Sequence, residues 1–352
     1  MKPIRAIVID DSAFMRKMIS DILNGDPRME VISIARNGEE GINKIIQLSP
    51  DVVTLDVHMP IMDGMNTLKK IMQKCPIPVV MLSSLTREGA AKTIEAISIG
   101  AVDFIAKPSG SISLNIETIA DEIRSKVYTA SKAQIKNNLT MSSSTDKKKQ
   151  ISFDGHRFEK TIVGIGTSTG GPRALQQVLV NLPATFTAPI LIVQHMPPGF
   201  TKSLAERLNT LSSIHVKEAV HGEIIEQKTA YIAPGDYHMT VKRIGTTLAI
   251  HLSKDVPIKG HRPAVNVLFD SIAKLKQMNK ITAVLTGMGN DGTDGIVSIK
   301  NTDSKSIIIA ENEATSIVYG MPKSAVNTGL VDYHIPLSEV SNLLVKLTKN
   351  RL

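Results

Sequence analysis

Short apolar runs alternate with segments of helical periodicity along the first third of the chain. Five such runs lie between residues 4 and 106: IRAIVI, VISIA, DVVTL, PVVML and VDFIA. Continuous apolar runs of this length predict strands buried on both faces, and the segments between them predict the helices that connect parallel strands. We therefore predict a doubly wound parallel α/β domain over residues 1–124.

This alternation stops between Thr129 and Gly155. The segment is rich in Ser, Thr, Asn and Lys, and its few apolar residues show almost no periodicity. Such a composition buries too little apolar surface to hold one conformation, so we predict a flexible linker at residues 125–157. The lysine run inside it is typical of a solvated tether rather than of a binding patch.

A second alternating series fills residues 158–352. The runs TIVGIGT, PILIVQH, ITAVLTG and SIIIAEN predict strands, and PRALQQVLV and PAVNVLFDSIAKLKQ predict helices. The stretch from Thr229 to Ser253 instead alternates apolar and polar residues around Gly245, which predicts an antiparallel hairpin. We therefore predict a mostly parallel, doubly wound α/β domain to which this hairpin is added.

Composition narrows the possible functions and location. The net charge of +8 would fit a nucleic-acid partner, but aromatic residues are only 3% and Trp is absent, which argues against base stacking. The second domain also lacks a compact helix-turn-helix pattern, and no apolar run approaches the ~20 residues that span a bilayer. The single cysteine, Cys75, and the lack of a signal-peptide pattern predict a reduced, cytoplasmic protein. We expect no nucleic-acid binding and no membrane insertion.

Polar side chains end the predicted strands of the first domain. In open α/β sheets, ligands bind beyond the carboxyl ends of the strands. Carboxylates that converge there are best tolerated around a hard cation such as Mg²⁺, beside which one carboxylate can attack a phosphoryl group. A hydroxyl and an ammonium at neighbouring strand ends would then contact the phosphoryl oxygens. The residues in these positions are Asp10, Asp11, Asp56, Ser83, Ser84 and Lys107.

Taken together, these strand ends and the loop MPIMDGM resemble those of response-regulator receiver domains. The resemblance implies a (βα)5 flavodoxin-like fold in which a histidine kinase phosphorylates Asp56 with the help of Mg²⁺. By position, the metal site would comprise Asp10, Asp11, Asp56 and the backbone carbonyl of His58. The residues of the switch would be the hydroxyl of Ser83, the aromatic ring of Phe104 and the phosphate-contacting Lys107.

The glycine-rich stretch VGIGTSTGGPRAL, residues 163–175, could hold a phosphate or present a nucleophile. A phosphate-binding Walker loop needs Lys where Pro172 stands, and the dinucleotide fingerprint needs glycine where Thr169 stands. The pattern G-x-S-x-G fits instead, with Ser168 at its centre. Since a serine needs a base and a carboxylate that orients the base, this interpretation depends on finding partners.

Two predicted strand ends supply such partners. His195 ends the run PILIVQH, and Asp291 lies in the glycine-rich turn after the run ITAVLTG. Asp294 is a rival for the carboxylate, but we expect it inside the following helix. On the residues alone, a serine hydrolase is favoured over turns that merely cap helices. A non-catalytic regulator that binds nucleotide or protein at the glycine-rich turn is the alternative.

Long motifs of the second domain resemble the CheB family of chemotaxis protein-glutamate methylesterases. They include GIGTSTGGPRAL, LIVQHMPPGFTKSLAERLN, AYIAPGDYHM, GHRPAVNVLFDSIA and LTGMGNDGTDG. The resemblance implies a catalytic triad of Ser168, His195 and Asp291, with Thr169 and Met288 beside the reacting serine. It further implies phosphorylation-activated hydrolysis of glutamate methyl esters on chemoreceptors, deamidation of receptor glutamines, and no cofactor for ester hydrolysis. Thr167 stands where many members have Ala, and its effect on the turn cannot be judged from the sequence.

Overall fold

The structure is a computed structural model that describes residues 2–107, 116–133 and 160–349. The first domain is a five-stranded parallel sheet with strand order β2-β1-β3-β4-β5. Its strands are β1 (Ile4–Ile9), β2 (Met29–Ala35), β3 (Val52–Asp56), β4 (Val79–Ser83) and β5 (Asp103–Ala106). Its helices are α1 (Ala13–Asn24), α2 (Gly38–Leu48), α3 (Gly64–Lys74), α4 (Arg87–Ile99) and α5 (Ile116–Ser131).

Local sequence explains both the strands and the helix starts of this domain. Successive residues of β1 belong to different cores, since Ile7 and Ile9 pack on one side of the sheet and Ala6 and Val8 on the other. Helices α1 to α4 each begin after a polar residue whose side chain accepts a backbone N–H of the first turn. The predicted doubly wound fold is therefore confirmed.

Helix α5 crosses the boundary predicted at residue 124. It continues to Ser131, so the first seven residues of the predicted linker 125–157 are helical rather than flexible. Buried side chains of Val127 and Ala130 pack into the core of the first domain, which explains why the helix continues. The predicted linker from residue 134 onward lies outside the described residues.

The second domain is built on a seven-stranded parallel sheet with order β14-β13-β12-β6-β7-β9-β8. The strands of this sheet are β6 (Thr161–Thr167), β7 (Ile190–Gln194), β8 (His215–Glu218), β9 (Thr229–Ile232), β12 (Asn279–Val284), β13 (Ile307–Glu311) and β14 (Tyr333–Ile335). The helices are α6 (Gly171–Val180), α7 (Phe200–Leu211), α8 (Val265–Ala273), α9 (Thr293–Thr302), α10 (Met321–Val326) and α11 (Leu337–Lys349).

Helices cover both faces of this sheet. Ile190 and Ile192 of β7 share a core with α6, α7 and α11, whereas Leu191 and Val193 share the opposite core with α8, α9 and α10. The chain runs from β6 outward through β7 and later returns to β12 on the other side of β6. The ends of β6, β7 and β12 therefore lie at the switch point of the sheet, where ligands bind in folds of this class.

The predicted hairpin exists, but it does not extend the parallel sheet. Strands β10 (His238–Ile244) and β11 (Thr247–Ser253) form a separate two-stranded antiparallel sheet, and Ala249 of β11 also makes an isolated bridge to Ile224. Residues 229–232, which we had assigned to the alternating stretch, form β9 and pair in parallel with β7 and β8. The apolar face of the hairpin is buried against α8 instead, through side chains such as Met239 and Val241.

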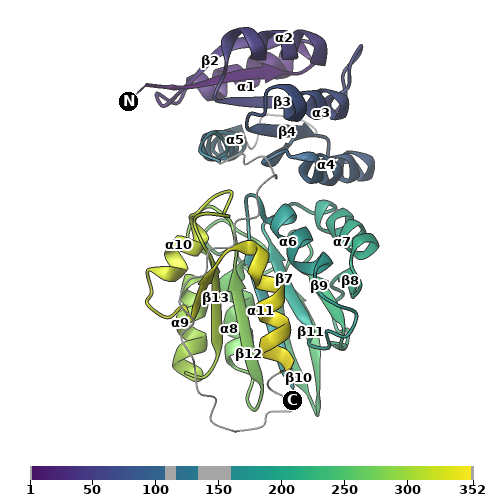
Figure 1. The fold of residues 1–352 in the computed structure, drawn as a ribbon, viewed down its shortest axis with the longest axis vertical. Helices are drawn as coiled ribbons and strands as arrows, with labels where there is room; N and C mark the ends of the chain where they lie inside the picture. The colour runs from purple at the N-terminus through teal and green to yellow at the C-terminus, as the bar shows by residue number, and fades with distance from the viewer. Residues whose placement is uncertain (1, 108–115, 134–159, 350–352) are drawn as a thin grey trace.

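The two domains share a buried junction. Figure 1 shows α4 and α5 of the first domain lying next to α6 and the upper end of the second sheet. The rings of Phe104 and Phe200 stack there with centroids 4.4 Å apart, and both side chains are buried. Ser98 also donates a hydrogen bond to Gln176 across the junction at 3.0 Å. Apolar residues of both domains thus form one continuous core cluster.

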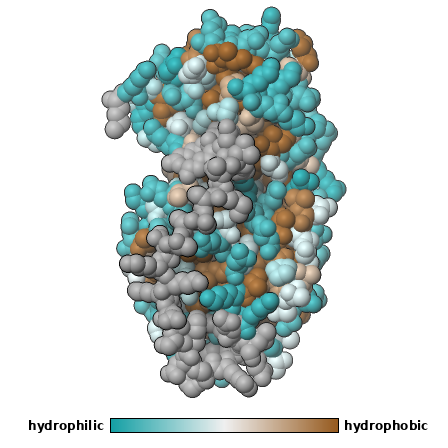
Figure 2. All heavy atoms as spheres, in the orientation of Figure 1, coloured by the Kyte–Doolittle hydropathy of each residue, from teal (hydrophilic) through white to brown (hydrophobic). Residues whose placement is uncertain are grey.

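The outer surface is mixed in character. On the face drawn in Figure 2, hydrophilic residues predominate and hydrophobic residues show as separate areas. Large exposed apolar side chains are spread over both domains, with examples at Phe14, Ile61 and Val256. Within the described ranges, no helix combines the length and the apolar character needed to cross a membrane.

Candidate active site and phosphoacceptor site

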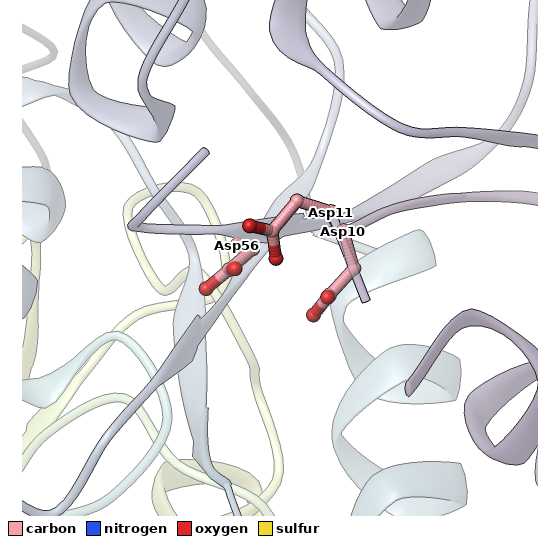
Figure 3. A group of neighbouring side chains, drawn as sticks. All are labelled: Asp10, Asp11 and Asp56. Atoms are coloured by element: carbon pink, nitrogen blue, oxygen red, sulfur yellow. The ribbon is translucent and has the colours of Figure 1, made fainter. Parts of the chain in front are cut away.

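Three carboxylates meet at the carboxyl edge of the first sheet. Asp10 and Asp11 follow β1, and Asp56 is the last residue of the neighbouring β3 (Figure 3). A carboxylate oxygen from each lies within 4.8 Å of those of the other two. Asp10 and Asp56 are buried and Asp11 is exposed. A set of three hard oxygen donors, open to solvent at one member, fits a Mg²⁺ ion.

Lys107 lies against the same carboxylates. Its Nζ is 2.8 Å from Asp10 Oδ2 and 2.8 Å from Asp56 Oδ2. Burial alone would lower the pKa of Lys107, but hydrogen bonds to the two carboxylates outweigh burial and the pKa is raised. Burial raises the pKa of Asp56, and the Lys107 ammonium opposes this without cancelling it. Lys107 therefore keeps its positive charge beside the carboxylate cluster.

Two further residues were predicted to belong to the receiver switch. Ser83 lies close to this cluster, and Phe104 lies at the junction between the domains. Ser83 ends β4, the strand beside Asp56, and its buried Oγ donates to the Ser84 carbonyl at 3.3 Å. Phe104 points away from solvent into the junction, where it stacks on Phe200. Lys126 Nζ lies 4.9 Å from the centre of the Phe104 ring, a distance that allows a cation–π contact.

Ser168 occupies a tight turn between β6 and α6. Its carbonyl accepts the Gly171 N–H at 2.8 Å, and Gly170 has a positive φ of 78° that favours glycine. The neighbouring loop is equally tight, because a Cβ on Gly287 would lie 2.8 Å from Ser168 Cβ. The glycines in this region therefore allow the chain to pass close to the serine, rather than forming a phosphate-binding loop.

His195 and Asp291 form a direct pair. His195 Nε2 lies 2.8 Å from Asp291 Oδ2, and both side chains are almost fully buried. The backbone N–H groups of Val265 and Asn266 also donate to the Asp291 carboxylate, at 2.6 and 3.0 Å. Burial would raise the pKa of Asp291, but the bond from His195 and these N–H groups outweigh burial and the pKa is lowered. Asp291 is therefore ionised and can orient the imidazole.

The other nitrogen of His195 remains available. Nδ1 is buried and has no hydrogen-bond partner in the part of the chain that the structure describes. The backbone N–H of His195 donates to the Thr167 carbonyl at 3.2 Å, which ties the base to the residue before Ser168. Within the same described residues, no hydrogen bond links the Ser168 hydroxyl to His195. Such bonds are often long before substrate binds, and Nδ1 is the nitrogen left to accept the serine proton.

Asp294, the rival carboxylate, does not contact His195. It lies in the first turn of α9, where its exposed Oδ2 accepts from Lys259 Nζ and Asn266 Nδ2, each at 3.1 Å. Its position in the helix agrees with the expectation from the sequence. Asp291 is thus the carboxylate that the fold brings to the histidine.

A second histidine, which sequence reasoning missed, covers the first. The ring of His261 stacks on His195 with centroids 3.9 Å apart and an interplanar angle of 9°. Burial and the neighbouring His195 lower the pKa of His261 to about 4. His261 is therefore neutral near pH 7 and does not oppose a positive charge on His195. The only signal in the sequence was its place in the motif GHRPAVNVLFDSIA.

Thr169 and Met288 both contact the first domain. Thr169 Oγ1 donates to Asp103 Oδ2 at 2.8 Å, and this hydroxyl–carboxylate bond is buried. Met288 Sδ accepts from Ser125 Oγ and Thr129 Oγ1, at 3.1 Å each. A cavity of about 970 Å³ between the domains also reaches Met288. The residues predicted to lie beside the serine are thus the ones that the receiver holds.

A buried carboxylate supports the turn from behind. Glu311, at the end of β13, accepts the Thr286 N–H at 2.8 Å and the Thr315 hydroxyl at 3.0 Å. The Thr286 carbonyl in turn accepts the Ser168 N–H at 3.1 Å, and its hydroxyl donates to the Thr169 carbonyl at 2.9 Å. Burial raises the pKa of Glu311 to about 7. Sequence reasoning did not identify either Glu311 or Thr286.

The fold and the two sites define a response regulator whose second domain is built as a hydrolase. Residues 6–117 match the response regulator receiver domain, and residues 163–344 match the CheB methylesterase family. The chain belongs to the CheB methylesterase family.

Relatives of known name extend over the whole chain. A protein from Oceanobacillus iheyensis, named protein-glutamate methylesterase/protein-glutamine glutaminase, is 61% identical over 98% of this chain and 99% of its own. A protein of the same name from Pyrococcus abyssi is 45% identical over 98% of this chain and 94% of its own. The crystal structure of the Thermotoga maritima CheB methylesterase catalytic domain is 44% identical, with a TM-score of 0.52. It covers 54% of this chain and 99% of that domain.

Proposed function

We propose that this chain hydrolyses glutamate methyl esters on chemoreceptors and deamidates receptor glutamines, under the control of phosphorylation at Asp56. The observation that carries the proposal is the buried His195–Asp291 pair at the strand ends next to Ser168. Full-length relatives that bear the name of this activity support it. A non-catalytic binding protein is not favoured, because such a protein would have no use for an ionised carboxylate held against a histidine.

In the proposed reaction, Ser168 Oγ attacks the carbonyl carbon of the ester and its proton passes to His195 Nδ1. Asp291 stabilises the imidazolium and keeps the proton of Nε2 in place. The tetrahedral intermediate collapses with loss of methanol, which takes the proton from His195. Water then attacks the acyl-enzyme by the same route and releases a glutamate carboxylate. With a glutamine, ammonia leaves in place of methanol.

The turn that carries Ser168 leads directly into α6. The N-terminus of a helix presents unpaired backbone N–H groups and a partial positive charge. These groups suit the oxyanion that develops on the ester carbonyl oxygen. His261, stacked on His195, is neutral and so does not oppose the positive charge that the imidazole gains in the reaction.

At the other site, Asp56 would accept a phosphoryl group from a histidine kinase. Asp10, Asp11 and Asp56 would hold Mg²⁺, which offsets the charge of the transferred group when bound. Lys107 contributes a second positive charge, already in contact with Asp56. Ser83, on the next strand, would donate a hydrogen bond to the new phosphoryl oxygens.

The junction supports a restraining role for the unphosphorylated receiver. Asp103 and the α5 residues Ser125 and Thr129 contact Thr169 and Met288, the two residues predicted to lie beside the nucleophile. We propose that charge added at Asp56 repacks this face and releases these contacts.

Methanol release from methylated receptor tests the proposal. The native chain should accelerate when a small-molecule phosphodonor and Mg²⁺ are added, whereas Asp56→Asn and a chelator-treated sample should keep the basal rate. Ser168→Ala should release no methanol above background in either state. Full activity of Ser168→Ala would refute the hydrolytic mechanism, and equal stimulation of Asp56→Asn would refute the switch.

A further inference from the structure

We infer that Gln194 is a positioning residue for the hydrolysis, because its side-chain amide binds the nucleophile turn and the base turn to each other. This inference rests on the proposed function, since it assumes that Ser168 and His195 react together. Gln194 is the last residue of β7, directly before His195, and its side chain is buried. It does not belong to the triad and makes no contact that the reaction itself requires.

The amide of Gln194 makes three hydrogen bonds. Nε2 donates to the Ser168 carbonyl and to the His195 carbonyl, each at 3.0 Å. Oε1 accepts the Thr167 hydroxyl at 3.0 Å. Both amide hydrogens are therefore used, one on the residue that carries the nucleophile and one on the residue that carries the base.

The surroundings permit only one orientation of this amide. Two carbonyl oxygens face Nε2, so a reversed amide would place its own oxygen against them. The Thr167 hydroxyl then has an acceptor in Oε1 and is fully buried with it. Since both side chains are buried, a carboxylate or an apolar side chain at position 194 would leave buried polar groups unpaired.

Helix α6 packs directly on the same pair of side chains. A Cβ on Gly171 would lie 1.8 Å from Thr167 Oγ1 and 1.9 Å from Gln194 Oε1. The Gly171 N–H donates to the Ser168 carbonyl, so that carbonyl is held from two directions. Gly171, which follows the turn, thus leaves the space that the Gln194 amide occupies, and this amide holds the turn in place.

This arrangement also explains Thr167, the position where many family members have Ala. Thr167 is buried and its hydroxyl donates to Gln194, so we expect it to act on the reaction through the amide rather than by contact with substrate. Its hydroxyl adds a bond on the side of the amide away from the two carbonyls. We therefore expect Thr167 to reinforce the positioning that Gln194 provides.

The test compares variants of the full-length chain. Gln194→Met removes the amide at nearly constant length, and Gln194→Glu keeps the shape but replaces the donor nitrogen with an acceptor. Gln177→Met makes the same change at an exposed position of α6 and is the matched control. Thr167→Val and Thr167→Ser separate the hydroxyl of Thr167 from its shape.

Three readouts are needed: kcat and KM for methanol release, the rate at which a serine-directed organophosphorus probe labels Ser168, and the thermal unfolding temperature. Misplaced reacting groups cost about 10- to 100-fold, so kcat and the labelling rate of both Gln194 variants should fall together by that factor. KM should stay within about two-fold of native, because the amide does not touch substrate. Thr167→Val should lose less than Gln194→Met, and Thr167→Ser should be close to native.

The inference is wrong if folded Gln194→Met and Gln194→Glu label and turn over like Gln177→Met, even with a lower unfolding temperature. That result would leave Gln194 a purely structural residue. If Gln194→Met does not fold, the inference is decided by comparing kcat and the labelling rate of Thr167→Val with those of Thr167→Ser. Ser168→Ala, run in parallel, shows separately whether the proposed function holds.

Discussion

Individual side chains at the active site differ in how firmly they are held. His195 is bonded to Asp291 through Nε2, is stacked under His261 and donates its backbone N–H to Thr167. Asp291 accepts two backbone N–H groups in addition to the histidine. The proposed base and its carboxylate are therefore held by several contacts, whereas within the described residues no hydrogen bond joins the Ser168 hydroxyl to His195.

Asp291→Asn should disable the enzyme and also lower its stability, because the amide nitrogen would face one of the buried backbone N–H groups that the carboxylate accepts. An amide cannot stabilise the imidazolium and can hold the wrong tautomer, so kcat for methanol release should fall roughly 10³- to 10⁴-fold. Asp294→Asn is the matched control, because Asp294 lies three residues away and pairs with Lys259 instead. A comparable loss in both variants, or none in Asp291→Asn, would contradict the assignment of the carboxylate.

Glu311 gives a prediction about pH and stability. Its pKa is raised from 4.5 to about 7, so between these values the folded chain keeps a proton that the unfolded chain releases. The contribution of Glu311 to stability is present below its ordinary pKa and is lost as the pH rises to about 7. Glu311→Gln should therefore lose less unfolding free energy than the native chain between about pH 5 and about pH 8.

Urea unfolding at the two pH values measures this difference. Glu313→Gln, at an exposed position two residues further on, serves as the control and should behave like the native chain. If Glu311→Gln and the native chain lose equal free energy over this interval, Glu311 does not titrate as a buried acid.

The elements show what the sequence could and could not predict. Apolar runs located β6, β7 and β12, and because parallel strands end at one edge, the meeting of His195 with Asp291 could be expected. Alternation predicted the hairpin but not its sheet, since the period is the same whichever partner a strand has. His261 was missed because a loop without periodicity carries it over His195.

The bonds of the Thr167 side chain could not be predicted at all. Its effect depends on which way the amide of Gln194 turns, and that is decided by carbonyls from two separate turns. The end of α5 was misplaced for a similar reason. Packing of Val127 and Ala130 on the sheet prolongs this helix into a segment whose composition indicated a linker.

Strand β5 carries a contact that tests directly whether the unphosphorylated receiver restrains the second domain. Asp103→Ala removes the carboxylate that accepts the Thr169 hydroxyl, so Thr169 is freed without any change in the second domain. Basal methanol release should rise by about 5-fold or more, which is the usual range of coupling between sites, and phosphodonor should add little further. Asp21→Asn, at an exposed position of α1, should leave both rates unchanged. An unaltered basal rate in Asp103→Ala would show that this contact does not restrain the enzyme.

At the scale of the whole molecule, one continuous apolar core joins the domain of the proposed phosphoacceptor to the domain of the proposed hydrolytic site. Phe104, which we predict to be the aromatic switch residue, is part of this core through Phe200 at the start of α7. A change at Asp56 can therefore reach the second domain through packed side chains. The cytoplasmic location, the Mg²⁺ ion and the particular kinase and receptors stay predictions.

Labelling by a serine-directed organophosphorus probe measures most directly whether Asp56 controls the reactivity of Ser168. We expect one labelled residue, Ser168, a faster rate with phosphodonor and Mg²⁺, no acceleration in Asp56→Asn, and no labelling in His195→Ala. Labelling at another residue would show that Ser168 is not the nucleophile, and equal acceleration of the native chain and Asp56→Asn would show that Asp56 does not control it.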